Sequence, residues 1–296
     1  MKATLDCLEC ISTQALRAAR IATSDETLQR RVLDACVSAV PGMDIERSPA
    51  ALSLVVYETV QQVSGIADPY REAKRAQNEM ALEIEDEMRT LVRESDQPLI
   101  AALHISAAGN IIDLGTMHTH EINVRETIDE VMHRRFAIDH SATFLESLKG
   151  CKDLLFLLDN AGEIVFDKIL IEELLKHTSV TAVVKAGPII NDAMMEDAEK
   201  VGLTQLCEVI DNGGAFVGSP LDLVPERFLE RMRRADVIIG KGQGNYETID
   251  VFEGDVFLIL RAKCGVIARH MGVDYGQVAM ISTRQRAREE SARQPV

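Results

Sequence analysis

The sequence predicts an α/β protein, in which helices cover both faces of a parallel sheet and a helical region precedes it. From residue 151 onward, short apolar runs alternate with helical segments, which is the pattern of consecutive βαβ units. Over the first hundred residues or so, apolar side chains recur three and four positions apart, the spacing of amphipathic helices. The chain of 296 residues is long enough for both parts.

The helical region is expected to begin with three helices separated by turns. They are expected at Leu5–Arg20, Glu26–Val40 and Ala50–Val63. A longer fourth helix should follow, because Asp68 can cap it and Pro69 suits its first turn. It should end before Pro98, since proline lacks the amide hydrogen that a helix interior needs. Residues 99–115 fit a helix followed by a short strand, with the boundary left open.

The second half of the chain contains five candidate strands. They are Leu154–Leu158, Val180–Lys185, Cys207–Ile210, Val237–Ile239 and Val256–Leu260. The first is entirely apolar, as expected for a strand buried on both faces. Helices are expected between them, including Asp192–Val201 and Pro225–Arg234. We therefore predict a helical domain at 1–98, an α/β domain at 99–282, and a polar tail at 283–296. A helical layer continuing to about residue 150 is the alternative boundary.

Composition narrows the class of protein. Apolar residues make up 46% of the chain and the net charge is −15, which argues against binding to nucleic acid or to anionic membranes. No apolar run approaches the roughly 20 residues that span a bilayer, and the first residues lack a secretory signal core. The six cysteines do not resemble a disulfide framework. We expect a cytoplasmic protein with no nucleic-acid or membrane partner; its oligomeric state stays open.

Polar motifs follow the first four candidate strands. Asp159-Asn160-Ala161-Gly162-Glu163 follows the first, Asn191-Asp192 the second, Asp211-Asn212 the third, and the glycine-rich loop from Lys241 to Asn245 the fourth. In a parallel sheet these four positions meet at one edge, where ligands of open α/β sheets bind. Ordinary β–α turns use the same residue types, but their agreement across four strands makes coincidence a poor explanation.

The chemistry expected at that edge is the binding of a cation and a phosphoryl group. Asp159, Asn160 and Asp192 offer two carboxylates and an amide oxygen, which suit a hard divalent cation. Lys241 supplies a positive charge for phosphate, and the helix N-termini after Gly162 and Asn191 add partial positive charge. Such a set is suited to positioning a phosphoryl group.

Other nucleotide and hydrolase signatures do not fit. The glycines at 240, 242 and 244 do not form G-x-G-x-x-G, and Lys241 is not followed by Ser or Thr as in a P-loop. No G-x-S-x-G elbow of the α/β hydrolases occurs. His118 and His120 could bind a metal together, but a loop or surface role is favoured because neither Cys nor a second His pair lies nearby.

Cys7 and Cys10 form a C-x-x-C pair in a helical segment. This spacing occurs in zinc sites and redox pairs, but there is no second C-x-x-C. Two semi-buried thiols without chemistry are one interpretation, since cysteine often behaves as a small hydrophobe. A metal or redox role, involving the distant Cys264, is the other.

Together the motifs resemble the metal-dependent damage-control phosphatases, first catalogued as domain of unknown function eighty-nine. The resemblance rests on DNAGE at 159–163, NDA at 191–193, DNG at 211–213 and KGQGNYE at 241–247. It extends to GNIID at 109–113, DPYREAK at 68–74 and the early CLEC, and so spans nearly the whole chain. The cysteine pair is similar to that of the stand-alone, mostly prokaryotic branch.

The resemblance implies a three-layer αβα domain with a Rossmann-like sheet, packed against an N-terminal α-helical domain. It also implies metal-dependent hydrolysis of small phosphorylated metabolites, such as sugar phosphates or reactive by-products, supported by Mn, Co, Ni or Mg. The metal ligands it implies are Asp159, Asn160 and Asp192, and these with Lys241 form the implied catalytic set. The implied phosphate- or substrate-binding residues are Glu163, Asn191, Asp211, Asn212, Lys241 and Asn245.

Two other classes of function remain open. One is a non-catalytic module that senses a metal and a phosphorylated ligand, and the other is a nucleotide- or sugar-binding transferase. Asp192 and Asp211 are candidates for a general base, but the sequence does not decide whether either acts as one, nor does it identify the substrate or the native metal.

Overall fold

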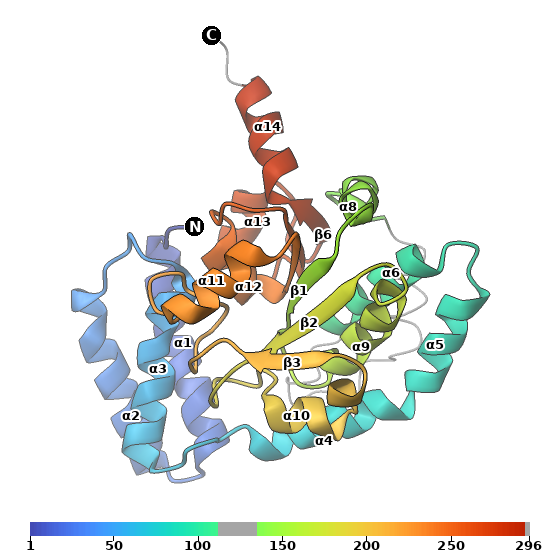
Figure 1. Ribbon diagram of the computed structural model, residues 1–296. Helices are drawn as coiled ribbons and strands as arrows, with labels where there is room; N and C mark the ends of the chain where they lie inside the picture. Colours follow the sequence, from blue (N-terminus) through green and yellow to red (C-terminus); the bar gives the residue numbers. More distant parts are fainter. Residues whose placement is uncertain (112–134, 294–296) are drawn as a thin grey trace.

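A six-stranded sheet forms the centre of the α/β part, and it is shown in the computed structural model of Figure 1, which describes residues 1–111 and 135–293. The strands are β1 (Asp153–Leu157), β2 (Ser179–Val184), β3 (Glu208–Asp211), β4 (Val237–Lys241), β5 (Val256–Arg261) and β6 (Val278–Ser282). Their order is β3-β2-β1-β4-β5-β6. β1 to β5 run parallel, and β6 is antiparallel to β5. All five predicted strands are confirmed, whereas β6 was not predicted.

The strand order reverses between β1 and β4, which are neighbours in the sheet although β2 and β3 lie between them in sequence. In open α/β sheets, ligands bind outside the carboxyl ends of the strands at such a switch point, which here lies between β1 and β4. The strand order and the parallel pairing confirm the predicted three-layer, Rossmann-like α/β class. The switch point is also the place where the strand-end motifs were expected to meet.

Helices cover both faces of the sheet. They are α6 (Pro98–Ile111), α8 (Ser141–Leu148), α9 (Glu163–Leu174), α10 (Met195–Lys200), α11 (Glu226–Arg234), α12 (Gly242–Ile249) and α13 (Gly265–Met271), with η2 (Leu203–Gln205) after α10 and α14 (Thr283–Arg293) closing the chain. Alternate residues of a strand face opposite sides. Leu154 and Phe156 of β1 accordingly join the core with α6 and α9, whereas Leu155 and Leu157 join the core with α11 to α13.

The N-terminal helices form two groups (Figure 1). The first group, α1 (Leu5–Ala22), α2 (Glu26–Ala39) and α3 (Pro49–Ser64), has its own core, with η1 (Val40–Gly42) between α2 and α3. The second, α4 (Arg71–Glu83) and α5 (Glu85–Glu94), packs against α9 of the sheet domain.

The single long helix expected after Asp68 is in fact two helices, α4 and α5, which are separated at Ile84. Asp68 does not cap α4 either, because the helix begins at Arg71. The Asp68 carboxylate instead accepts a hydrogen bond from the amide of Tyr70 at 3.0 Å and forms an ion pair with Lys74 at 2.8 Å. Its role is to fix the approach to the helix.

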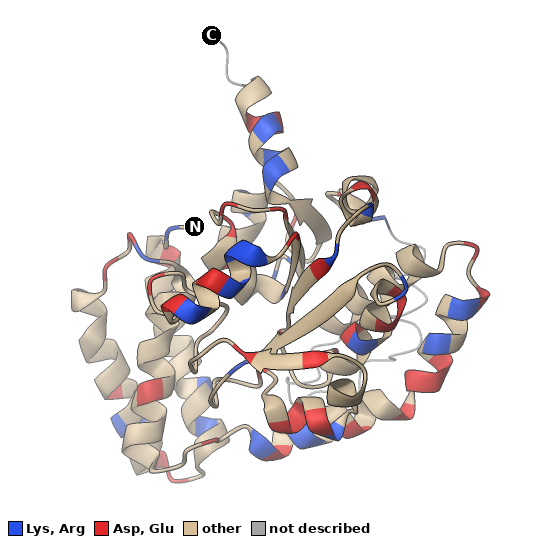
Figure 2. Cartoon of the chain, in the orientation of Figure 1, with Lys and Arg blue, Asp and Glu red and all other residues tan. Residues whose placement is uncertain are grey.

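Exposed charges are interspersed along the outer helices. Figure 2 shows acidic and basic positions following one another along α4, α5 and α11. The intermixing is consistent with a solvated surface, as the sequence suggested. In the part of the chain that the structure describes, no helix has both the length and the apolarity needed to cross a membrane.

Candidate functional site

The loops that follow β1 and β2 are joined by backbone hydrogen bonds. The amide of Ala161 donates to the carbonyl of Asn191, and the amide of Ala193 donates to the carbonyl of Asp159, both at 2.8 Å. Asn160 and Asp192 form an isolated antiparallel bridge. The structure therefore brings together Asp159, Asn160 and Asp192, the three residues expected to bind a metal.

Two side-chain amides hold the carboxylates of this cluster in place. Nδ2 of Asn160 donates to Asp159 Oδ2 at 3.1 Å and to Glu163 Oε1 at 2.8 Å. Nδ2 of Asn110, at the end of α6, lies 3.1 Å from both oxygens of Glu163 and 3.4 Å from Asp159 Oδ2. The side-chain oxygen Oδ1 of Asn110 in turn accepts a hydrogen bond from the backbone amide of Arg261 at 3.0 Å. Glu163 thus belongs to the acidic cluster, as its place in the motif suggested.

The cluster is buried, and its carboxylates lie close enough together to act on one another electrostatically. Asp159 is 8% exposed, and Glu163 and Asp192 are each 3% exposed. Burial raises the pKa of Asp159 well above its usual value, and the negative charges of Glu163 and Asp192 raise it further. Burial likewise raises the pKa of Asp192 to about 6, although Lys185 opposes the shift. Such shifts arise when carboxylates share a dry site, and a bound cation would relieve them.

The donor set fits a divalent cation. Oδ2 of Asp192 is buried without a hydrogen-bond partner, since Lys185 Nζ lies 3.5 Å away, too far for a good hydrogen bond. The Asn160 nitrogen is occupied by carboxylates, so its carbonyl oxygen is left as a ligand. Among the described residues, no group of three or more His, Cys, Asp or Glu side chains is arranged to hold a metal. Three ligands, two carboxylates and one amide oxygen, would leave coordination positions for water and substrate, because such cations usually take six or more oxygen ligands.

Gly242, the first residue of α12, lies directly against Asp159. Its φ of 76° belongs to the left-handed region, which side chains with a Cβ rarely adopt. A Cβ added at this position would lie 1.8 Å from Asp159 Oδ2. The glycine-rich loop after β4 therefore allows close approach of the backbone to the Asp159 carboxylate.

Lys241, the expected phosphate-binding lysine, is buried beside the cluster, with Nζ 3.9 Å from Glu163 Oε2. Its side chain is fully buried, and Nζ donates to Asp167 Oδ1 at 2.5 Å and to the Ser106 carbonyl at 2.8 Å. The strand pleat gives the reason. Val237 and Ile239 of β4 face the core beside α6 and α9, and Lys241 shares their direction. In this geometry its charge serves an internal ion pair, so direct contact with phosphate stays an untested prediction that the structure does not favour.

The amides of Asn245 and Asn191 are also engaged within the protein. Asn245 Nδ2 donates to the Lys241 carbonyl at 2.8 Å and lies near the carbonyls at the end of β1. Asn191 Nδ2 donates to Gln77 Oε1 of α4 at 3.2 Å. Both residues therefore shape the loops of the site here, and their contact with substrate stays a prediction.

Asp211 and Asn212 form a turn after β3. The Asp211 carboxylate is exposed and accepts a hydrogen bond from the backbone amide of Gly213 at 2.8 Å. The side chain of Asn212 is buried, and its oxygen Oδ1 accepts a hydrogen bond from the backbone amide of Gly214 at 3.2 Å. Asn212 also lies 3.4 Å from the carbonyl of Gly218. These bonds place both side chains in the loop itself, so a role for Asp211 as a base gains no support.

Three residues near the cluster were missed by sequence reasoning. Lys185 directly follows β2 and forms an ion pair with Asp192. Lys263 follows β5, and its positive charge opposes the rise in the pKa of Asp159. The carboxyl ends of parallel strands meet at one edge of a sheet. This rule could have identified both lysines, because each lies just after a strand. Asn110 lies within GNIID at 109–113, a stretch that belongs to the family resemblance, but that pattern alone assigns it no role.

The cysteines expected to share a role lie near one another. Cys7, Cys10 and Cys264 are free thiols, and burial, followed by the nearby Cys264 and Cys7, raises the pKa of Cys10. The Cys264 sulfur accepts the amide of Ile267 at 3.5 Å at the start of α13. A metal or redox role for these thiols stays a prediction. His118 and His120 lie outside the described residues.

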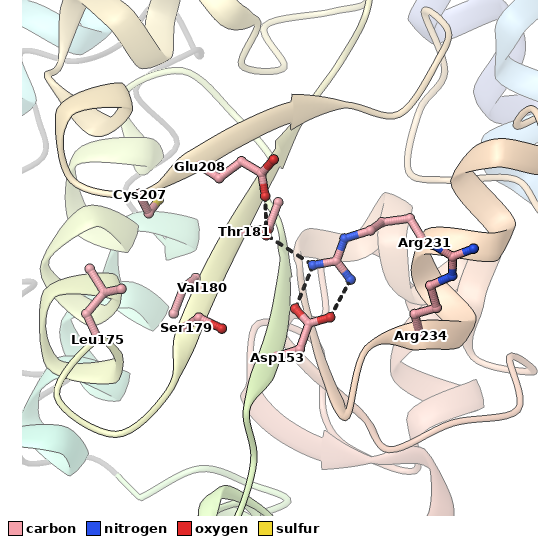
Figure 3. A pocket seen from close by; sticks show the side chains of 9 residues that line it. All are labelled: Asp153, Leu175, Ser179, Val180, Thr181, Cys207, Glu208, Arg231 and Arg234. Carbon is pink, nitrogen blue, oxygen red and sulfur yellow. Dashed lines mark hydrogen bonds and ion pairs between the residues drawn. The ribbon is translucent and has the colours of Figure 1, made fainter.

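A hollow of about 580 Å³ lies at the opposite edge of the sheet, beside the starts of β1, β2 and β3. Figure 3 shows that Arg231 faces Asp153 there, and its guanidinium donates to both carboxylate oxygens, at 2.6 and 2.9 Å. Its charge is therefore already neutralised. The two carboxylates that line the hollow are also engaged, since Asp153 binds Arg231 and Glu208 accepts a hydrogen bond from the hydroxyl of Thr181 at 2.9 Å.

The fold and the acidic cluster agree with a protein-family comparison. Residues 3–278 match the model of the damage-control phosphatase ARMT1-like domain. Since the match covers most of the chain, the protein belongs to this family. The family expected from the sequence motifs is thereby confirmed.

Three archaeal proteins are similar over nearly their full length. An uncharacterized protein of Methanocaldococcus jannaschii is 35% identical, covering 93% of this chain and 94% of its own. A damage-control phosphatase of Pyrococcus horikoshii is 33% identical, covering 96% of this chain and 99% of its own. A damage-control phosphatase of Archaeoglobus fulgidus is 30% identical, covering 94% of this chain and 98% of its own. The crystal structure of a DUF89 family protein from Pyrococcus horikoshii superimposes with a TM-score of 0.88 at 32% identity, covering 96% of this chain and 99% of that one.

Proposed function

We propose that this protein is a metal-dependent phosphatase that hydrolyses small phosphorylated metabolites, such as sugar phosphates or reactive phosphorylated by-products. The observation that carries the proposal is the buried cluster of Asp159, Asn160 and Asp192 at the switch point of the sheet, in which Oδ2 of Asp192 has no hydrogen-bond partner and only a long ion pair with Lys185. Relatives that bear the name damage-control phosphatase support the class of reaction. Cytoplasmic location remains the expectation from the sequence.

The residues fit a divalent cation of the Mn, Co, Ni or Mg type. Asp159 and Asp192 would hold it through carboxylate oxygens and Asn160 through its amide oxygen. When bound, such a cation supplies positive charge to phosphoryl oxygens and to the water that attacks phosphorus. The near absence of solvent around the carboxylates makes that charge more effective than it would be in water.

The chain itself contributes orientation and compensating charge. Asn110 and Asn160 hold the Glu163 carboxylate between them, which keeps an acceptor beside the site for orienting water. Lys185 lies against Asp192, and the charge of Lys263 acts on Asp159, so both lysines add positive potential where a phosphoryl group would lie. The start of α9 at Glu163 adds the partial charge of its backbone amides.

The test is phosphate release from metal-stripped protein, with Mg, Mn, Co or Ni added back singly. The substrates would be a panel of sugar phosphates and a generic aryl phosphate. Release should require metal and disappear in Asp159→Ala. Because the buried Asp159 carboxylate is disfavoured by its surroundings, this variant should keep its fold, which circular dichroism and thermal melting would verify.

The matched control is Asp153→Ala, which removes a carboxylate from the other end of the same strand, where it pairs with Arg231. It should retain activity. Metal binding without release of phosphate from any substrate would favour a sensor, and transfer of phosphate only to an acceptor other than water would favour a transferase. Full activity in Asp159→Ala would overturn the assignment of the site.

A further inference from the structure

Helix α4, outside the sheet domain, has a buried polar face directed at both loops of the acidic cluster. Lys74, Gln77 and Asn78 are each no more than 2% exposed, and their spacing of three and four residues places them on one side of the helix. Buried polar groups are costly unless they form hydrogen bonds. The partners of this face therefore indicate why polar side chains are retained there.

Asn78 bonds directly to the loop after β1 and, through Asp197 of α10, to the loop after β2. Its Oδ1 accepts the amide of Gly162 at 2.7 Å, immediately before Glu163 at the start of α9. Its Nδ2 donates to Asp197 Oδ1 at 2.8 Å, and Asp197 Oδ2 in turn accepts the amide of Met194 at 2.9 Å. A single side chain thus ties the loop carrying Asp159 and Asn160 to the loop carrying Asp192.

Gln77 forms a second tie to the β2 loop. Its Oε1 accepts the side-chain amide of Asn191, the neighbour of Asp192, at 3.2 Å. That loop is also under backbone strain, because Ile190 has a φ of 43°, which is costly for a β-branched residue. A strained loop keeps its shape only where surrounding contacts fix it, and Gln77 supplies one of those contacts.

We infer that Asn78, assisted by Gln77, is a positioning residue that holds the two metal-binding loops in register from the N-terminal helical region. This inference rests on the proposed function, since it assigns a role at the same site. It explains why α4 has a polar buried face. It also means that the N-terminal helices contribute to the site without touching substrate.

The experiment compares wild type, Asn78→Ala and the exchanged pair Asn78→Asp/Asp197→Asn. The exchange reverses the direction of the hydrogen bond between residues 78 and 197. Each of the two side chains keeps an oxygen, which can still accept the backbone amide of Gly162 or of Met194. Mn²⁺ affinity would be measured by calorimetry, kcat and KM with a generic aryl phosphate at saturating Mn²⁺, and exchange protection of the Gly162 amide by mass spectrometry. Removing groups that orient metal ligands typically weakens metal affinity or activity about 10- to 100-fold.

For Asn78→Ala we expect Mn²⁺ affinity to fall at least about 10-fold, kcat to fall more than KM rises, and the Gly162 amide to lose protection. The exchanged pair should recover most of each loss. Val92→Ala is the control: it truncates a buried apolar side chain on the adjacent α5, so it should lower thermal stability while leaving Mn²⁺ affinity and kcat unchanged.

The outcomes separate this inference from the proposed function. Wild-type Mn²⁺ affinity and kcat in a folded Asn78→Ala would overturn the positioning role while leaving the phosphatase intact. A wild type that binds Mn²⁺ but releases no phosphate would overturn the phosphatase, and the calorimetry would still test Asn78. Equal losses in Val92→Ala, or no recovery in the exchanged pair, would show that Asn78 acts only through general stability and would also overturn the inference.

Discussion

Replacing Gly242 with alanine should displace Asp159 and disable the site. The new Cβ would lie 1.8 Å from Asp159 Oδ2 and 2.3 Å from its Cγ, whereas carbon and oxygen in contact stay about 3.3 Å or more apart. The carboxylate or the loop must therefore shift by more than about 1 Å, and a misplacement of that size can lower the rate about 100-fold. The left-handed φ of 76° adds a folding cost of about 1–2 kcal/mol.

Gly202→Ala separates these two effects. Gly202 has nearly the same φ, 77°, but a Cβ there would meet nothing within 4 Å. Both variants should lose the stability that the left-handed φ costs, and Gly242→Ala should lose more in thermal unfolding because of its clash. Only Gly242→Ala should lose metal-dependent phosphate release and weaken Mn²⁺ binding. Wild-type activity in a folded Gly242→Ala, or an equal loss in Gly202→Ala, would refute the reasoning.

Three further predictions concern stability. Burial raises the pKa of Glu247 to about 7 from a usual 4.5, so the native state binds a proton that the unfolded state has lost, and the free energy of unfolding should fall by about 3 kcal/mol as pH rises from about 4.5 to 7. Denaturant titrations across this range should show that Glu247→Gln no longer has this pH-dependent loss. The same pH slope in the variant as in wild type would contradict the prediction. Lys241→Met should destabilise the protein by about 3–5 kcal/mol by leaving the Asp167 carboxylate without its ion pair, and adding Asp167→Leu should recover most of the loss. A double variant no more stable than Lys241→Met alone would argue against the buried ion pair. Mn²⁺ at 100 times its dissociation constant should stabilise wild type by about 2.7 kcal/mol but leave Asp159→Ala unshifted in thermal melting, and an equal shift in both proteins would place the metal elsewhere.

The sheet was predictable because its strands are strongly apolar runs. Leu154–Leu158 contains no polar residue, and such a run is typical of a strand covered on both faces. β6 was missed because Val278–Ser282 is a short stretch in which Ala and Met dilute the signal. The break between α4 and α5 was missed because the region around Ile84 carries neither Gly nor Pro to mark it.

The place of the site was predictable, but the direction of its side chains was only partly so. Strand ends bring Asp159, Asp192 and Lys241 to one edge, as the topology requires. The sequence does not state which layer a strand-end side chain enters, and the pleat of β4 turns Lys241 toward Asp167. Contacts from distant helices, such as those of Asn110 and Asn78, depend on packing that no local pattern encodes.

The central claim is that the loops of β1 and β2 create one cation site. The most direct test is a crystal of the protein soaked in Mn²⁺, with the ion located by its anomalous scattering. The account predicts a single strong peak within ligand distance of the Asp159, Asn160 and Asp192 side chains, lost in Asp159→Ala. A peak elsewhere with none at these residues, or an unchanged peak in that variant, would contradict it.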